Sequence, residues 1–186
     1  MNGRAAAIRE AALGLLLMQN PVGRFALLSL DYTALVTSEP VICCDLSEIS
    51  EPGNGVLGAS TTRGGIGVVY IDTDAVRRLE PDAVRTVLHE YGHIILRHGG
   101  GRNDRASENE ADEFALEFLV PEFFVRYLAL GAGFPDEKYL SGFLPAPADM
   151  IKKRLGRMRK NGRYIPCRTE LELMKRFFSP DNPDKQ

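Results

Sequence analysis

The sequence predicts an α+β fold, in which a small sheet packs against two consecutive helices and a helical C-terminal part follows. Residues 66–71 form a β-branched and aromatic run between glycines and an aspartate, which is typical of a strand. Residues 81–95 and 108–120 instead carry apolar side chains at helical spacing. With 186 residues, of which 44% are hydrophobic, the chain is long enough to bury a core without disulfides. These observations favour one domain with a small helical appendage.

The first part of the chain is predicted to hold one helix and several short strands. Residues 4–19 are rich in Ala and Leu, and the Asn20-Pro21 pair ends this helix. A loop rich in Gly, Ser and Thr follows at 51–65, and Val56-Leu57 within it has the character of a paired segment. Between the helix and the loop we expect strands at residues 25–30, 34–36 and 41–43.

The first of the two consecutive helices has clear start and stop signals. Pro81 suits the first helical turn, where a missing backbone N–H costs nothing. Asp82 then places a negative charge at the positive end of the helix dipole. The run Gly99-Gly100-Gly101 ends the helix.

The second helix is expected to begin after Ser107, a good N-cap residue, and to stop at Pro121. Further on, the segment from Gly131 to Pro135 interrupts the chain. We expect one helix before this interruption, at residues 123–130, and two after it, at residues 148–158 and 170–178. A polar tail is expected at residues 179–186.

Composition excludes several functional classes. The net charge of −2 and the pI near 6.0 give no overall attraction to nucleic acid or to an anionic membrane. Three cysteines, an odd number, do not make a disulfide framework, and we expect reduced thiols. No segment is long and apolar enough to span a bilayer, and the short apolar run from Ala11 to Met18 lacks the features of a signal peptide. We therefore expect a cytoplasmic protein.

The segment His89-Glu90-Tyr91-Gly92-His93 has the H-E-x-x-H pattern of a zinc site with its own general base. On a helix, His89 and His93 lie one turn apart on one face, where both imidazoles reach one metal ion. Glu90 lies beside the ion, where it accepts a proton from the attacking water. We predict Zn²⁺ as the cofactor, His89 and His93 as metal ligands, and Glu90 as the catalytic base.

A third protein ligand is expected, because hydrolytic zinc sites combine three protein ligands with one open position. Glu108 shares the inward face of the second helix with Ala111 and Ala115, and Asp112 follows it one turn later. We predict Glu108 as the ligand and Asp112 as the carboxylate that accepts the free ring N–H of a ligand histidine. Glu110, on a different side of the helix, is the alternative ligand. Helices rich in glutamate also occur on ordinary protein surfaces.

Together, H-E-Y-G-H-I-I-L-R-H and the following E-N-E-A-D-E-F-A-L-E-F-L-V-P resemble the ImmA/IrrE family of metallopeptidases. The resemblance covers residues 68–121, and the basic helix at 148–158 is similar to one that follows in the family. Tyr91 replaces the usual leucine. The resemblance implies a zincin-like fold and a compact, cytoplasmic zinc endopeptidase of the kind associated with phages and mobile elements. Its implied partner is a protein substrate, typically a helix-turn-helix transcriptional repressor whose cleavage releases gene expression.

On this basis we assign residues 1–130 to a zincin-like catalytic domain and residues 131–186 to a small helical region packed on it. An alternative function is a non-catalytic zinc protein that sequesters a repressor or a toxin. The intact Glu90 favours the enzyme, since binding alone needs no base. A structural zinc module is disfavoured because it would need four closed ligands.

Three features of the proposed enzyme remain open in the sequence. The strand at 66–71 is either an edge strand, to which an extended substrate adds, or a central one; replacing Val69 by Pro separates the two. The basic segment 152–163 is a solvated helix face, a dock for an acidic substrate patch, or a DNA contact, and direct nucleic-acid binding is the least expected. Candidate donors to the reaction's oxyanion are Tyr70, His98, Tyr127 and Tyr139.

Overall fold

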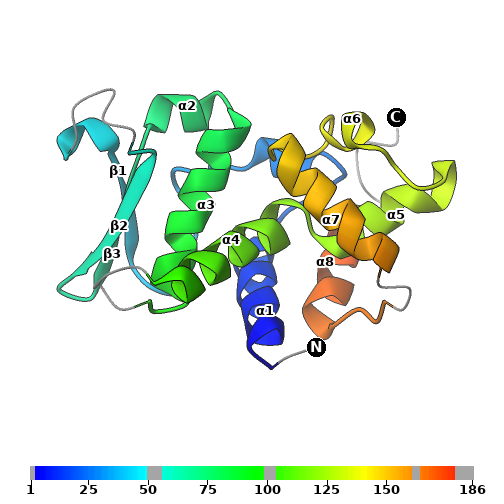
Figure 1. The fold of residues 1–186 in the computed structure, drawn as a ribbon, viewed down its shortest axis with the longest axis horizontal. Helices are drawn as coiled ribbons and strands as arrows, with labels where there is room; N and C mark the ends of the chain where they lie inside the picture. The colour runs from blue at the N-terminus through cyan, green and yellow to red at the C-terminus, as the bar shows by residue number, and fades with distance from the viewer. Residues whose placement is uncertain (1–2, 50–55, 99–103, 161–163, 179–186) are drawn as a thin grey trace.

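The computed structural model describes residues 3–49, 56–98, 104–160 and 164–178. Within these ranges a small sheet lies at one end of the molecule and helices make up the rest (Figure 1). The α+β class predicted from the sequence is therefore confirmed. The predicted terminator at residues 99–101, the tail from residue 179 and Arg163 of the basic segment lie outside the described residues.

The sheet contains β1 (Val41–Asp45), β2 (Gly58–Arg63) and β3 (Ile66–Ile71) in the order β1-β3-β2. Strand β1 runs parallel to β3, and β2 runs antiparallel to it. Gly64 and Gly65 join β2 to β3 in a two-residue turn, and both have positive φ angles, as a hairpin turn of this length requires. Because β3 has a partner on each side, its interpretation as an edge strand is wrong and the central alternative holds.

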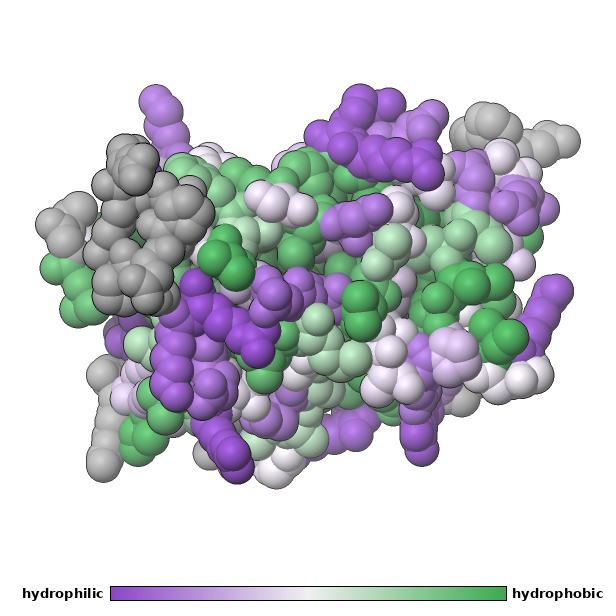
Figure 2. All heavy atoms as spheres, turned by 180° about the vertical axis from the view of Figure 1, so that it is seen from behind, coloured by the Kyte–Doolittle hydropathy of each residue, from purple (hydrophilic) through white to green (hydrophobic). Residues whose placement is uncertain are grey.

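One face of the sheet is turned toward the helices. Gly67 approaches α3 so closely that an added Cβ would lie 2.9 Å from the Ile94 side chain, and Val69, on the same face of β3, is fully buried. Val68 and Tyr70 alternate to the outer face. On the view from behind, hydrophobic side chains gather at the end formed by the sheet (Figure 2). The isoleucines exposed on or beside the strands are Ile42, Ile49 and Ile66.

Two of the predicted strands are wrong. Residues Ala26–Ser29 form a short 3-10 helix, and residues 34–36 belong to no regular element. The backbone here is bonded locally: the buried Tyr32 hydroxyl donates to the Leu27 carbonyl at 2.8 Å, and the Asp31 carboxylate accepts from the Thr33 N–H at 2.9 Å. These short-range hydrogen bonds replace the ladder of a sheet.

The two motifs of the sequence lie on two consecutive helices, α3 and α4. Helix α3 (Pro81–Ile95) begins at the predicted proline. Helix α4 (Arg105–Leu119) begins earlier than predicted, because Asp104 is its N-cap and accepts from the Ser107 N–H at 2.8 Å. The prediction of Ser107 as the cap is therefore wrong. The two helices approach closely at Gly92, where an added Cβ would lie 3.2 Å from Ala111 Cα.

Helix α4 also packs against the N-terminal helix. Helix α1 (Gly3–Met18) packs on α4 and on α8, and it ends one residue before its predicted end. The predicted helical regions near the C-terminus are present with slightly different bounds. Short elements also follow β1 and β3. The elements not yet given bounds are η2 (Leu46–Glu48), α2 (Thr73–Arg77), α5 (Glu122–Ala132), α6 (Glu137–Leu140), α7 (Ala148–Lys160) and α8 (Arg168–Phe178).

The basic helix α7 is less solvated than a plain surface helix. Arg154 is only 3% exposed, donates to the Val120 carbonyl at 2.8 Å and forms an ion pair with Glu117. Arg157 forms a two-pronged pair with Glu113 of α4. These two arginines thus attach the helix to α4.

Among the described residues, none of the helices combines the length and the apolar character that crossing a bilayer requires.

Candidate metal centre

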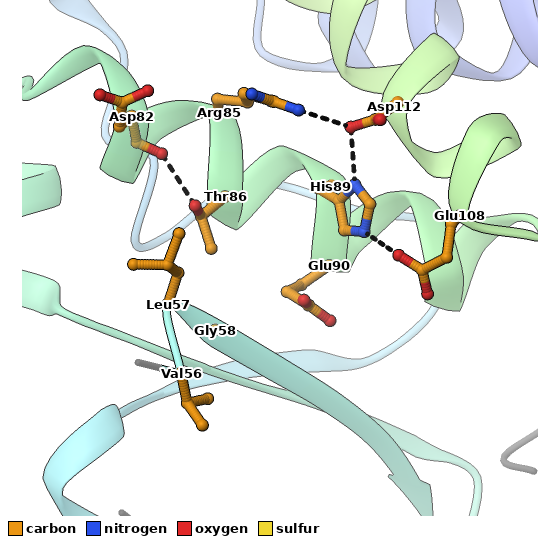
Figure 3. Close-up of a pocket in the computed structure, with 10 residues that line it drawn as sticks. All are labelled: Val56, Leu57, Gly58, Asp82, Arg85, Thr86, His89, Glu90, Glu108 and Asp112. Carbon is orange, nitrogen blue, oxygen red and sulfur yellow. Dashed lines mark hydrogen bonds and ion pairs between the residues drawn. The ribbon is translucent and has the colours of Figure 1, made fainter. Parts of the chain in front are cut away.

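Three side chains from two helices converge beside the sheet. His89 and His93 lie one turn apart on α3, and Glu108 reaches them from the first turn of α4 (Figure 3). The Nε2 atoms of the two histidines are 3.0 Å apart. Glu108 Oε2 lies 3.2 Å from Nε2 of His89, and Glu108 Oε1 lies 3.5 Å from Nε2 of His93. The three residues predicted as ligands therefore meet at one point.

These distances fit a tetrahedral metal site. Ligand atoms that are bound at about 2.1 Å to one tetrahedral zinc ion lie roughly 3.4 Å apart. The ligand atoms of His89, His93 and Glu108 all lie within 4.8 Å of one another, and the three closest pairs bracket that spacing. Two imidazole nitrogens and one carboxylate oxygen are also a donor set that zinc prefers in hydrolytic sites. The residues present thus fit the metal that their pattern predicts.

Asp112 lies where it was predicted, behind His89. Its Oδ1 atom is 3.1 Å from Nδ1 of His89, and it also accepts from Arg85 at 3.1 Å. The hydrogen bond with His89, followed by that of Arg85, lowers the pKa of Asp112 to about 2 although burial opposes this. A carboxylate accepts and does not donate, so Nδ1 of His89 carries the proton and Nε2 is free to bind a metal.

The two histidines differ in basicity. Burial lowers the pKa of His89, but its hydrogen bond to Asp112 and the nearby carboxylates outweigh burial, so the pKa is raised. Burial and the neighbouring His89 lower the pKa of His93. The His93 ring also contacts a third histidine, since Nδ1 of His98 lies 2.9 Å from Nδ1 of His93.

Glu110, the alternative ligand, does not reach the other ligand atoms. Its Oε2 atom lies 3.0 Å from Nε2 of His98, and its carboxylate is paired with Arg4 of α1. The geometry therefore favours Glu108 over Glu110 as the third ligand. His98 is engaged on both ring nitrogens, which argues against its use as an oxyanion donor.

Glu90 points from α3 into the space between the helix and the edge of the sheet (Figure 3). Burial raises its pKa, although a hydrogen bond from Ser60 on β2 lowers it in part. The neighbouring strand comes close here because Gly58 has no side chain: an added Cβ would lie 2.5 Å from Thr86 and 3.4 Å from Glu90 Cγ. A carboxylate with a raised pKa is suited to take up and release a proton.

A cleft of about 360 Å³ opens in front of Glu90. Val56 and Leu57 lead into β2 on one side of it and remain exposed, so the predicted pairing of these two residues does not occur. Within the described residues, none of the four predicted oxyanion donors lines this cleft. Its lining comprises Val56, Leu57, Gly58, Asp82, Arg85, Thr86, His89, Glu90, Glu108 and Asp112.

Sequence reasoning missed two contributors to this cleft. Arg85 lies one turn before His89 on α3, a spacing that already indicated a shared helix face. Gly58 follows a glycine-rich stretch of sequence, and no local pattern shows which helix its strand approaches. The helical spacing of Arg85 could thus have been recognised in the sequence, whereas the role of Gly58 could not.

Comparison with known proteins gives the class and the family. The family model described as the IrrE N-terminal-like domain, a peptidase family, matches residues 66–156, which include β3, α3, α4 and most of α7. The chain thus carries a metallopeptidase domain. Over this segment it belongs to the ImmA/IrrE family, as the motifs of the sequence predicted. The comparison with curated proteins finds no match.

Proposed function

We propose that the protein is a zinc-dependent endopeptidase with a zincin-like catalytic site. The observation that carries the proposal is the convergence of His89, His93 and Glu108, with Glu90 facing the adjacent cleft. Such an arrangement supplies three ligands and a base, and it leaves room for substrate. Residues 1–130 form the catalytic part in this proposal, and residues 131–186 form the helical region packed on it.

The residues divide the work of peptide hydrolysis among them. When bound, zinc polarises the scissile carbonyl and makes water a stronger acid. Glu90 takes a proton from the attacking water and later delivers it to the leaving amine. Its burial supports this role, because a carboxylate with a raised pKa is a stronger base and accepts a proton more readily than a fully solvated one. Asp112 keeps the His89 ring in its metal-binding orientation.

The substrate's backbone is proposed to lie along β2. This strand pairs with β3 on one side and borders the cleft through Gly58. An extended peptide gains main-chain hydrogen bonds by adding to such an edge, and the exposed Val56 and Leu57 offer it apolar contacts. A proline at Val69 does not test this placement, because β3 is the central strand and proline there would break the sheet itself.

The proposed substrate is a cytoplasmic helix-turn-helix repressor, by analogy with the family. The test compares the wild type with Glu90→Gln after each is added to an extract of the source cells. New protein N-termini that appear with the wild type alone, one of them inside a DNA-binding repressor, are expected. General-base catalysis contributes about 10²–10⁴-fold, so the variant should cleave at least about 100-fold more slowly.

The zinc content of the Glu90→Gln variant shows whether a loss of cleavage comes from the missing base or from a missing metal. Glu90 does not ligate in this proposal, so the variant should keep its zinc. Full biological activity of Glu90→Gln with no cleavage by either protein would contradict the enzyme and favour sequestration of the partner. Cleavage of a protein that is not a repressor would overturn the proposed substrate and leave the enzyme standing.

A further inference from the structure

We infer that His98 and Glu110 form a relay that positions His93 as a ligand, by deciding which of its ring nitrogens carries the proton. This inference rests on the metal site of the proposed function. His98 follows α3, and its side chain is only 7% exposed. Neither His98 nor Glu110 lines the cleft, so both act through His93 and are positioning residues.

The end of α3 turns His98 back over His93. Leu96 is the C-cap, and the next two residues return to the helix: Arg97 N–H bonds the Ile94 carbonyl at 3.0 Å, and His98 N–H bonds the His93 carbonyl at 2.9 Å. This pair of bonds is a Schellman motif, which requires a left-handed residue. Arg97 takes that conformation with φ +57°, at a position that usually holds glycine. The turn thus places the two imidazoles in contact.

The contacts define the protonation pattern of three groups in a row. Glu110 Oε2 lies 3.0 Å from Nε2 of His98, and a carboxylate only accepts, so this nitrogen carries the proton. In a neutral ring Nδ1 of His98 is then an acceptor. It lies 2.9 Å from Nδ1 of His93, which must therefore donate. The proton of His93 is fixed at Nδ1 by a carboxylate that it does not touch.

The consequence falls on the metal side of the His93 ring. With its proton on Nδ1, neutral His93 presents a lone pair at Nε2 toward Glu108, 3.5 Å away. The opposite tautomer would direct an N–H at the place of the metal and block binding. The His93 side chain is only 7% exposed, so water has little access to Nδ1 and cannot readily take the place of His98 as the hydrogen-bond acceptor. The relay therefore prepares the site before the metal arrives.

The relay ends outside the segment that matches the family. Arg4 of α1 donates to Glu110 through Nε at 2.8 Å and through a second nitrogen. The Arg4 side chain is 50% exposed, so this last contact is screened by solvent. Helix α1 is in this way connected to a metal ligand through three side chains, and the effect of substitution should decline from His98 to Glu110 to Arg4.

The first test reads the tautomers in the metal-free protein. The chain has only 3 histidines, so a long-range ¹H–¹⁵N spectrum resolves every ring. At a pH where the rings are neutral, the relay predicts the Nδ1–H form for His93 and the Nε2–H form for His98. Observation of His93 in the Nε2–H form, or of a mixture like that of free histidine, would overturn the inference.

The second test measures zinc affinity by competition with a chelator. His98→Phe keeps a ring but removes both nitrogens, and it should weaken zinc binding by roughly 10–100-fold, as loss of a partner behind a ligand does. His98→Asn keeps an acceptor near the place of Nδ1 and should stay close to the wild type. Asn109→Ala, an exposed change between Glu108 and Glu110, is the control. Equal weakening by Phe and Asn would contradict the relay and indicate a packing role.

These tests separate the relay from the proposed function. Wild-type protein with the predicted tautomers but no zinc binding would overturn the metal site and not the relay. Tight zinc binding with the wrong tautomer for His93 would overturn the relay and not the enzyme. Thermal unfolding of the metal-free variants shows whether each one is folded before its affinity is compared.

Discussion

The two histidines of the site, His89 and His93, both carry their proton on Nδ1, but different hydrogen-bond partners hold it there. Nδ1 of His89 donates a hydrogen bond directly to the Asp112 carboxylate, which also accepts from Arg85 on the same helix as the histidine. His93 instead meets a neutral ring, His98, and only then a carboxylate. The direct support of His89, by Asp112 and Arg85, is confined to α3 and α4. The relayed support of His93, through His98 and Glu110, extends to Arg4 on α1. The comparison shows that a short motif can place two histidines side by side without defining which groups hold their rings.

The difference has an electrostatic consequence. A full negative charge next to the ring raises the pKa of His89, whereas burial and the nearby His89 lower the pKa of His93. His89 is thus the more basic of the two histidines, and the environment of His93 favours its neutral form. Direct support should therefore matter more for affinity than relayed support.

The largest effect that separates the two routes is expected at Asp112. Asp112→Ala removes the acceptor of the His89 Nδ1–H and leaves Arg85 only its longer ion pair, 3.8 Å to Asp149. Zinc affinity should fall by roughly 10–100-fold, and by more than in Glu110→Gln, which acts through one more side chain. Chelator competition on both variants provides the measurement. A larger loss in Glu110→Gln would reverse the ranking of the two supports.

A substitution at Gly92 should disturb both supports at once, because α4 carries both Asp112 and Glu110. An added Cβ would meet Ala111 Cα at 3.2 Å and Phe114 Cβ at 3.3 Å, so Gly92→Ala must move α4 by a few tenths of an ångström. Overpacking of this kind costs about 1–3 kcal/mol. We expect a lower free energy of unfolding in urea and weaker zinc binding. Wild-type stability with wild-type affinity would show that the helices adjust freely.

The smallest effect concerns acid stability without metal. Hydrogen bonds from His89 and from Arg4, respectively, lower the pKa values of Asp112 and Glu110 to about 2. A depressed pKa stabilises the fold above the ordinary value of the group, and this contribution is lost as the pH falls toward the folded-state pKa. The wild type should therefore lose stability between about pH 5 and pH 2. Asp112→Asn and Glu110→Gln should each lose less, as measured by thermal unfolding.

Parallel curves for the wild type and both variants would contradict this assignment. A difference in Asp112→Asn alone would confine the acid response to the direct support. A difference in both would show that the relayed support is also formed without metal.

The sequence predicted the parts of the site that depend on local spacing. His89, Glu90 and His93 follow from one helical turn, and Glu108 and Asp112 follow from the inward face of the next helix. The starts of the helices could be predicted nearly as well. At α4, however, Asp104 and Ser107 are both good N-cap residues, and spacing alone does not choose between them.

Long-range arrangement was less predictable. Residues 25–30 have the composition of a strand, yet Tyr32 and Asp31 bind the local backbone instead. The central place of β3 depends on β1, whose residues pair with residues 26 positions later in the chain, as Val41 does with Gly67. The part played by His98 depends on a turn at Arg97 and on a partner on another helix. Such contacts are set by packing, which periodicity does not encode.

The central claim is tested most directly by the zinc content of the purified protein and of two single variants, measured by elemental analysis. The account predicts about one zinc per chain in the wild type, none in Glu108→Ala, and about one in the control Asn109→Ala. Zinc retained in Glu108→Ala, or a folded wild type that holds none when zinc is supplied, would contradict it.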